Sequence, residues 1–134
     1  MNRNELLKLC SDYLESIPKN LNYLTPVELL ALIEIDPDKI FLLDTRTEES
    51  FNQYHIPGAV NIPLRSVLQE KNLSQLPVDK PIVVCCWVGH TASQVLAILQ
   101  ILGYNALGLK YGYGESAIKG EDQRGWYELN FPIE

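Results

Sequence analysis

Residues 82–92 read Ile-Val-Val-Cys-Cys-Trp-Val-Gly-His-Thr-Ala, and we expect the fold to be organised around this stretch. The apolar, mostly β-branched run that ends in the cysteines is typical of a buried strand in a parallel sheet. From Thr91 to Leu102 the apolar residues recur at helical spacing, so the pattern predicts a strand, a short loop and a helix. The amides and the dipole of that helix would point back at the loop and favour an anion there.

Cys86 stands at the end of the predicted strand, beside those helix amides. A thiolate would be stabilised at this place, so we interpret Cys86 as a reactive nucleophile. The alternative is a packing role, because free cysteine is among the most buried residue types. Adjacent Cys85 points to the opposite face of the strand and is expected in the core. Cys10, at an apolar position of an N-terminal helix, is also expected to be a packing residue.

Composition excludes several classes of function. The chain has 134 residues, enough for one domain with a real core, and a net charge of -6, which argues against nucleic acid or an anionic membrane surface as a partner. No apolar run approaches the length of a membrane span. The charged first residues differ from a signal peptide, so we expect a cytoplasmic protein; an exported protein whose signal was removed is the alternative.

Metals and cofactors are not expected. Three cysteines, of which two are adjacent, form neither a disulfide framework nor a zinc ligand set with only two histidines. No glycine-rich dinucleotide motif and no Walker motif occurs, so a nucleotide site is not expected either.

The rest of the chain alternates helices and strands, which implies a parallel sheet covered on both faces. Residues 4–16 have the spacing of an amphipathic helix, so residues 1–18 are expected to form an N-terminal helix packed on a domain of residues 19–134. Thr25-Pro26 starts a helix that ends before Pro37, and Thr47 caps a short one. The remaining predicted elements are strands at 40–43, 60–63 and 105–109, a short helix at 64–70, and a helix buried on more than one side that ends at Gly103. The tail is expected to pack as a closing element through Trp126, Tyr127, Leu129 and Phe131.

Asp44 and Arg46 follow the strand at 40–43 at its carboxyl end, where ligands bind in open α/β sheets. The interpretation that the residues favour is an ion pair within the loop, between Arg46 and Glu48 or Glu49, since such pairs are common. The alternative is a ligand-binding role, and we keep Arg46 among the candidate substrate-binding residues.

His55 lies just before a Pro-Gly turn. A histidine there could be an acid or base, but its position favours a brace whose ring nitrogens hydrogen-bond the loop.

Two stretches, taken together, resemble the rhodanese family. The first has Asp-Thr-Arg at 44–46, His-Ile-Pro-Gly-Ala at 55–59 and Asn-Ile-Pro at 61–63, similar to the family signature D-x-R … H-I-P-G-A … N-I-P. The second is the strand, cysteine loop and helix from Ile82 to Gly103, with Cys86 at the nucleophile position. The resemblance covers residues 23–126.

This resemblance implies a rhodanese-like three-layer sandwich, with a central five-stranded parallel sheet and helices on both faces. It also implies a sulfurtransferase, in which Cys86 attacks a donor such as thiosulfate and becomes a persulfide. Cyanide, a thiol or a protein acceptor would then remove the outer sulfur. The substrate-binding residues implied by the loop are Trp87, Val88, Gly89, His90 and Thr91, whose amides would encircle the persulfide.

The sequence also departs from the family. Many thiosulfate-using relatives carry Arg or Lys at the positions of Trp87 and Thr91, whereas this loop has no cation. Lys110 could supply the charge from the end of the next strand, or it could be an ordinary exposed lysine. Residues 111–114, Tyr-Gly-Tyr-Gly, replace the family's usual Gly-Gly, and the loop at 111–116 could border the cysteine pocket.

Two rival functions remain. A cysteine phosphatase or arsenate reductase uses a similar strand, loop and helix, but needs an arginine where this chain has Ala92. A non-catalytic rhodanese-like binding or redox-sensing module is the rival from another class, and the uncharged loop leaves it open.

Overall fold

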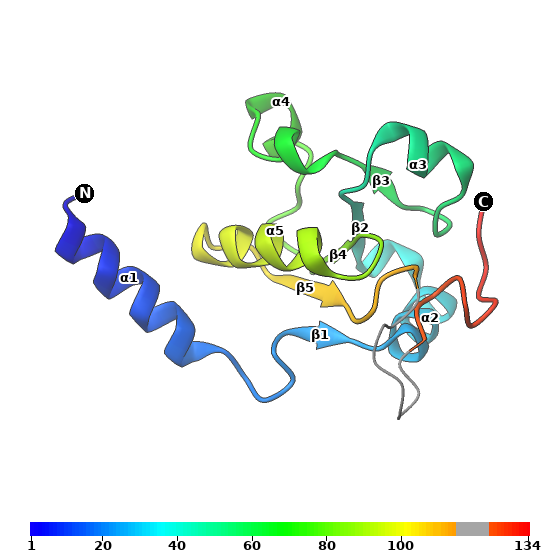
Figure 1. The fold of residues 1–134 in the computed structure, drawn as a ribbon, viewed down its shortest axis with the longest axis horizontal. Helices are drawn as coiled ribbons and strands as arrows, with labels where there is room; N and C mark the ends of the chain where they lie inside the picture. The colour runs from blue at the N-terminus through cyan, green and yellow to red at the C-terminus, as the bar shows by residue number, and fades with distance from the viewer. Residues whose placement is uncertain (115–123) are drawn as a thin grey trace.

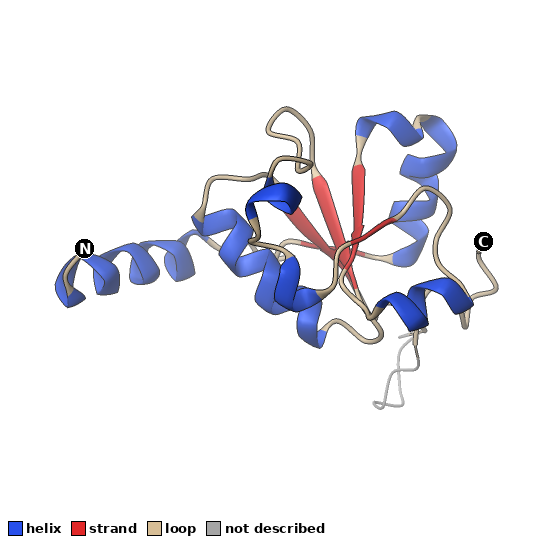
Figure 2. Cartoon of the chain, turned by 90° about the horizontal axis from the view of Figure 1, so that it is seen from above, coloured by secondary structure: helices blue, strands red, loops and turns tan. Residues whose placement is uncertain are grey.

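The computed structural model describes residues 1–114 and 124–134. Its centre is a five-stranded parallel sheet in the order β1-β5-β4-β2-β3, with helices on both faces (Figures 1 and 2). The three inner strands are β2 (Phe41–Asp44), β4 (Ile82–Cys85) and β5 (Ala106–Leu109), and the two-residue edge strands are β1 (Tyr23–Leu24) and β3 (Val60–Asn61). The fold class that the sequence predicts is therefore confirmed.

Two apolar cores lie on the two faces of the sheet, and successive residues of β4 alternate between them. Ile82 and Val84 belong to the core under α5 (His90–Ile101), while Val83 and Cys85 belong to the core under α2 (Pro26–Ile35). All four β4 side chains are buried, which explains why the strand reads as an unbroken apolar run. Cys86, the first residue after β4, continues the alternation and belongs to the core under α5.

The predicted helix starts are confirmed by their caps. The side chain of Thr25 accepts a hydrogen bond from the amide of Glu28 at the start of α2. Thr47 caps α3 (Glu48–Gln53) in the same way through the amide of Ser50. Gly103 follows α5 with φ +96°, the left-handed conformation expected after a helix.

Three local predictions need correction. The helix expected at 64–70 is a 3₁₀ turn, η2 (Leu64–Ser66), followed by a separate short helix, α4 (Glu70–Leu73). Edge strand β1 was missed because two residues carry no periodic signal. The α5 helix is buried on one side only, since its outer apolar residues Ile98 and Ile101 are exposed, as is Leu102 directly after it.

Helix α1 (Arg3–Ser16) forms as predicted, with Asn2 and Glu5 in a capping box. We expected its apolar side to pack on the domain, but none of its residues is buried and Leu14 is 67% exposed. Figure 1 shows α1 reaching out beyond the sheet. A hydrogen bond from the Tyr13 hydroxyl to Gln100 Oε1 (2.6 Å) links it to α5. Cys10 is only half-buried, so it is not the core residue that we expected.

The expected packing of the closing tail is confirmed at Trp126 and Phe131 but not at Tyr127. Trp126 is 1% exposed, meets Phe131 edge to face and joins the core under α2, whereas Tyr127 is 48% exposed. In residues 1–114 and 124–134, no helix is both long and apolar enough to cross a membrane.

Candidate active site around Cys86

The Cys86 sulfur lies in a cradle of backbone amides at the start of α5. The amide of Gly89 donates to Sγ at 3.0 Å and the amide of Ala92 at 3.4 Å. Gly89 has φ +102°, a conformation that L side chains rarely adopt, and this turn directs its amide back toward β4. Two donors and the positive end of α5 favour a negative charge on this sulfur.

Cys86 is 4% exposed, but it lines a cavity of about 440 Å³ that opens at the carboxyl ends of β2 and β4. The walls of this cavity, called the Cys86 cavity below, come from the segments after β2, β3 and β4. Most of the surface that lines the cavity is apolar, because the polar residues expose largely their carbon atoms. The lining residues are Thr45, Arg46, Thr47, Ser50, Pro63, Leu64, Arg65, Cys86, Trp87, Val88, His90 and Thr91.

Cys85 faces away from this cavity, as the strand alternation predicts. It is fully buried in the core under α2, with Sγ 4.0 Å from the Tyr113 hydroxyl. Burial raises the pKa of the Cys85 thiol well above its usual value, and the negative charge of Asp44 raises it further. Cys85 is therefore held as a neutral thiol, unavailable to a ligand in the Cys86 cavity.

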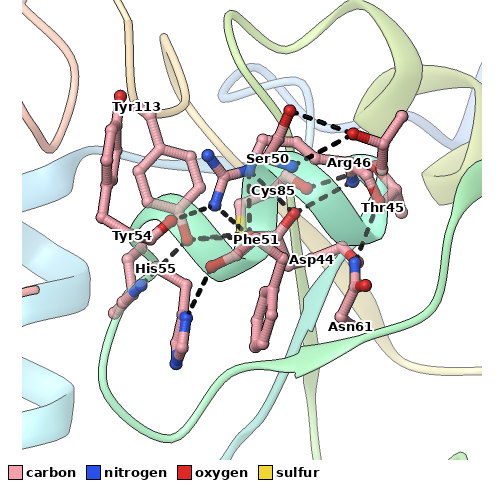
Figure 3. A network of polar contacts seen from close by, with 12 residues as sticks. Asp44, Thr45, Arg46, Ser50, Phe51, Tyr54, His55, Asn61, Cys85 and Tyr113 are labelled. Atoms are coloured by element: carbon pink, nitrogen blue, oxygen red, sulfur yellow. Dashed lines mark hydrogen bonds and ion pairs between the residues drawn. The ribbon is translucent and has the colours of Figure 1, made fainter. Parts of the chain in front are cut away.

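A buried polar network supports the cavity from behind (Figure 3). Both Asp44 carboxylate oxygens accept hydrogen bonds from Arg46, the shortest from Nη2 at 2.8 Å. The Tyr113 hydroxyl donates to Asp44 Oδ2 at 2.9 Å and accepts from the Ile56 amide at 2.9 Å. Arg46 Nη2 also donates to the Tyr54 carbonyl at 2.7 Å. The network joins β2, the end of α3 and the loop after β5.

Arg46 keeps its charge inside this network. Burial opposes the charged guanidinium, but the hydrogen bonds and the charge of Asp44 outweigh burial, so the pKa of Arg46 is raised. Its guanidinium carbon lies 3.8 Å from the ring centroid of Tyr113 and 4.7 Å from that of Trp87. Arg46 Nη1 is buried and is the one buried side-chain polar atom without a partner in the described part of the chain. The ion pair predicted within the loop is present, but its partner is Asp44 rather than Glu48 or Glu49.

The loop after β5 holds the cysteine loop in place through its backbone. The amides of Tyr113 and Gly114 donate to the carbonyls of Cys86 (3.2 Å) and Trp87 (2.6 Å). Gly112, with φ +55°, comes so close that a Cβ there would meet the Cys86 carbonyl oxygen at 2.1 Å. This segment braces the back of the cysteine loop instead of lining the cavity; Glu115 and Ser116, which we also expected there, lie outside the described residues.

The structure brings most of the predicted site residues together. Trp87, Val88, His90 and Thr91 line the Cys86 cavity, and Gly89 contributes its amide. The hydrogen bonds to Sγ come from Gly89 and from Ala92, which the sequence interpretation did not include. Lys110 does not line this cavity: it lies at a neighbouring hollow with Tyr111, whose ring is 5.4 Å from its Nζ.

His55 is a brace, as predicted: Nδ1 lies 2.9 Å from the Phe51 carbonyl oxygen and Nε2 lies 3.3 Å from Glu134 Oε2. Arg65 and Leu64 line the cavity but were missed, since their sequence positions carry no chemical motif. No cluster of three His, Cys, Asp or Glu side chains suited to a metal ion occurs in the described ranges 1–114 and 124–134.

Sequence comparison identifies relatives over most of the sheet. A family model for the rhodanese-like domain matches residues 25–117. The thiosulfate sulfurtransferase PspE of Escherichia coli is 35% identical over 72 residues, which are 51% of this chain and 69% of that protein. A tRNA sulfurtransferase of Pyrobaculum aerophilum is 36% identical over 80 residues, which are 58% of this chain but only 16% of that protein.

Structural comparison extends the likeness to the whole chain. A crystal structure of a Bacillus halodurans protein matches with a TM-score of 0.70 and 25% identity, covering 99% of this chain and 86% of that one.

Proposed function

The chain belongs to the rhodanese-like family, and we propose that it transfers sulfane sulfur from a donor to a thiophilic acceptor through a persulfide on Cys86. The family match and the sulfurtransferases among its relatives support a sulfurtransferase-type enzyme. The donor and the acceptor are part of the proposal, as is the role of each site residue.

The observation that carries the proposal is the amide cradle of Cys86. Its sulfur accepts two backbone hydrogen bonds at the bottom of a cavity, and it is the cavity's cysteine because Cys85 points into the core. Preorganised backbone donors of this kind can each stabilise a developing anion by about 3 kcal/mol. Such a site suits both a thiolate and the anionic outer sulfur of a persulfide.

The proposed reaction has two displacement steps at sulfur. In the first, the Cys86 thiolate attacks the sulfane sulfur of the donor; the donor's sulfur–sulfur bond breaks, and with thiosulfate the leaving group is sulfite. In the second, cyanide or a thiolate attacks the outer sulfur of the Cys86 persulfide, and the Cys86 thiolate is released. Each bond formed replaces one bond broken, so the cycle needs no oxidant and no cofactor.

Intact mass spectrometry tests the first step directly. The protein is incubated with thiosulfate, or with a more reactive organic persulfide, and its mass is measured after rapid desalting. We expect a gain of one sulfur atom, lost again after cyanide or a thiol is added, with thiocyanate formed in the cyanide reaction.

Cysteine variants decide which thiol carries the sulfur. Cys86→Ser should abolish both the mass gain and thiocyanate formation, whereas Cys85→Ala and Cys10→Ser should keep most of the activity. Wild-type turnover by Cys86→Ser would contradict the proposal. Failure of the wild-type protein to gain sulfur from either donor would favour the non-catalytic module instead.

A further inference from the structure

We propose that Arg65 forms an anion subsite in the Cys86 cavity, so that the preferred donor is an organic persulfide carrying a carboxylate group. This inference rests on the proposed sulfurtransferase function and assigns the substrate class of the same cavity.

Arg65 is the unpaired cation of the cavity lining within the described residues. Arg46 and Arg65 are the two arginines of its lining, and no lysine joins them. Arg46 is 4% exposed and its charge is already balanced by Asp44 at 2.8 Å. Arg65 is exposed, and its side chain forms no hydrogen bond or ion pair within residues 1–114 and 124–134. An incoming anion would therefore find an unbalanced positive charge at Arg65.

The backbone that carries Arg65 is firmly held, so its side chain starts from a fixed wall of the cavity. The preceding residue, Leu64, donates its amide to the Thr45 carbonyl at 3.1 Å, which ties η2 to the end of β2. The Ser66 carbonyl accepts a hydrogen bond from Asn72 Nδ2 at 2.7 Å. The exposed Arg65 side chain can turn toward a ligand, while the backbone that carries it stays in place.

Arg65 lines two neighbouring hollows, the Cys86 cavity and a second, apolar groove of about 200 Å³. The two hollows share Leu64 and Arg65. The other apolar residues of this groove are Val67, Leu68, Val95, Ile98 and Leu99. The apolar surface available to a ligand thus continues past the charge.

The size and lining of the cavity indicate the class of donor. A cavity of about 440 Å³ with mostly apolar walls falls within the range that organic ligands occupy. A small inorganic dianion would leave Leu64, Trp87 and Val88 uncovered. An organic persulfide would place its sulfur at Cys86, its carbon atoms on those walls and its carboxylate at Arg65, where guanidinium and carboxylate match as hydrogen-bonding partners.

The loading step with such a donor balances without a further reactant. The Cys86 thiolate attacks the outer sulfur of the donor R–S–SH, and a new sulfur–sulfur bond forms on Cys86 as the donor's own bond breaks. The donor leaves as the thiolate R–S⁻, and the transferred sulfur keeps its proton or releases it to water.

A matched pair of donors tests the inference. The probes are the persulfides of N-acetylcysteine and of N-acetylcysteine amide, which share the reacting sulfur and differ in the carboxylate. The second-order rate constant for sulfur loading on Cys86 is measured for each by intact mass at low and high salt. We expect the wild-type protein to favour the carboxylate donor about three- to fivefold, as for an exposed charge pair, and less at high salt.

Variants assign that preference to Arg65. Arg65→Gln should bring the ratio of the two rate constants to about one, and Arg65→Lys should keep part of the preference. Lys71→Gln removes the same charge from an exposed residue that lines neither hollow, and it should keep the wild-type ratio. A ratio unchanged by Arg65→Gln, or lowered equally by Lys71→Gln, would overturn the inference. Absence of loading from both donors would instead count against the proposed function itself.

Discussion

At the scale of single residues, the pairing of Asp44 with Arg46 decides how the cavity wall is built. The Asp44 carboxylate is fully buried and receives hydrogen bonds from Arg46 and Tyr113, while the charge of Arg46 lies against two aromatic rings. A buried pair of this kind does not by itself imply added stability, but loss of one partner leaves an uncompensated charge in the interior.

We predict that Asp44→Asn destabilises the protein by about 3–5 kcal/mol, because the charge of Arg46 would remain buried without its partner. Urea unfolding measures this free energy. Asp12→Asn is the matched control, since Asp12 forms an exposed ion pair with Lys8 (2.6 Å) and its loss should cost less than about 1 kcal/mol. Equal losses in the two variants would show that the Asp44–Arg46 pair is not effectively buried.

At the scale of elements, the cysteine loop takes its shape from the loop after β5. Gly112 touches the carbonyl of Cys86 closely, and the next two amides donate to the carbonyls of Cys86 and Trp87. The amide cradle of the sulfur therefore depends on a segment more than twenty residues away along the chain.

We predict that Gly112→Ala slows sulfur loading of Cys86 by about tenfold to a hundredfold, because its Cβ would push the Cys86 carbonyl and shift the sulfur. Intact-mass kinetics with an organic persulfide measures the rate, and a thermal melt checks that the variant is folded.

Gly58→Ala is the control for backbone strain. Gly58 also has a positive φ, +85°, but a Cβ there would meet nothing within 4 Å, so this variant should lose stability while keeping the loading rate. If both variants load sulfur equally fast, the contact behind Cys86 does not position the sulfur.

At the scale of the whole molecule, the core under α2 contains a thiol and a phenol that folding keeps neutral at alkaline pH. Burial raises the pKa of the Cys85 thiol and of the Tyr113 phenol, and the nearby charge of Asp44 raises both further. In the unfolded chain a thiol ionises from about pH 8.5 and a phenol from about pH 10. Above these values the unfolded state releases protons that the folded state keeps, so the stability present at lower pH is lost as pH rises.

We predict that the free energy of unfolding decreases between pH 8.5 and 10, with Cys85 contributing about 1.4 kcal/mol per pH unit once its unfolded thiol is ionised. Urea unfolding at several pH values measures the slope. Cys85→Ala should remove this contribution, whereas Val83→Ala, which truncates another buried residue of β4, should lower stability without changing the slope. An unchanged slope in Cys85→Ala would contradict the raised pKa of Cys85.

Local patterns in the sequence were enough to predict the inner strands, the capped helices and the opposite directions of Cys85 and Cys86. These features depend on hydrophobic period and on hydrogen bonds between near neighbours, which the order of residues specifies directly. The partner of Arg46 was also within reach of the sequence. Residues two apart in extended chain lie on the same side, and this favours Asp44 over the glutamates of α3.

Only the tertiary structure decided which cations line the Cys86 cavity. Lys110 follows a strand next to β4, yet its side chain lies outside the Cys86 cavity, while Arg65 comes from a turn with no recognisable motif. The expected packing of α1 on the domain was not found for the same reason: an amphipathic stripe predicts a helix, but not the surface that covers it. The physical reason is that such neighbours are set by strand order and by the directions of loops, and these depend on contacts between residues far apart in the chain.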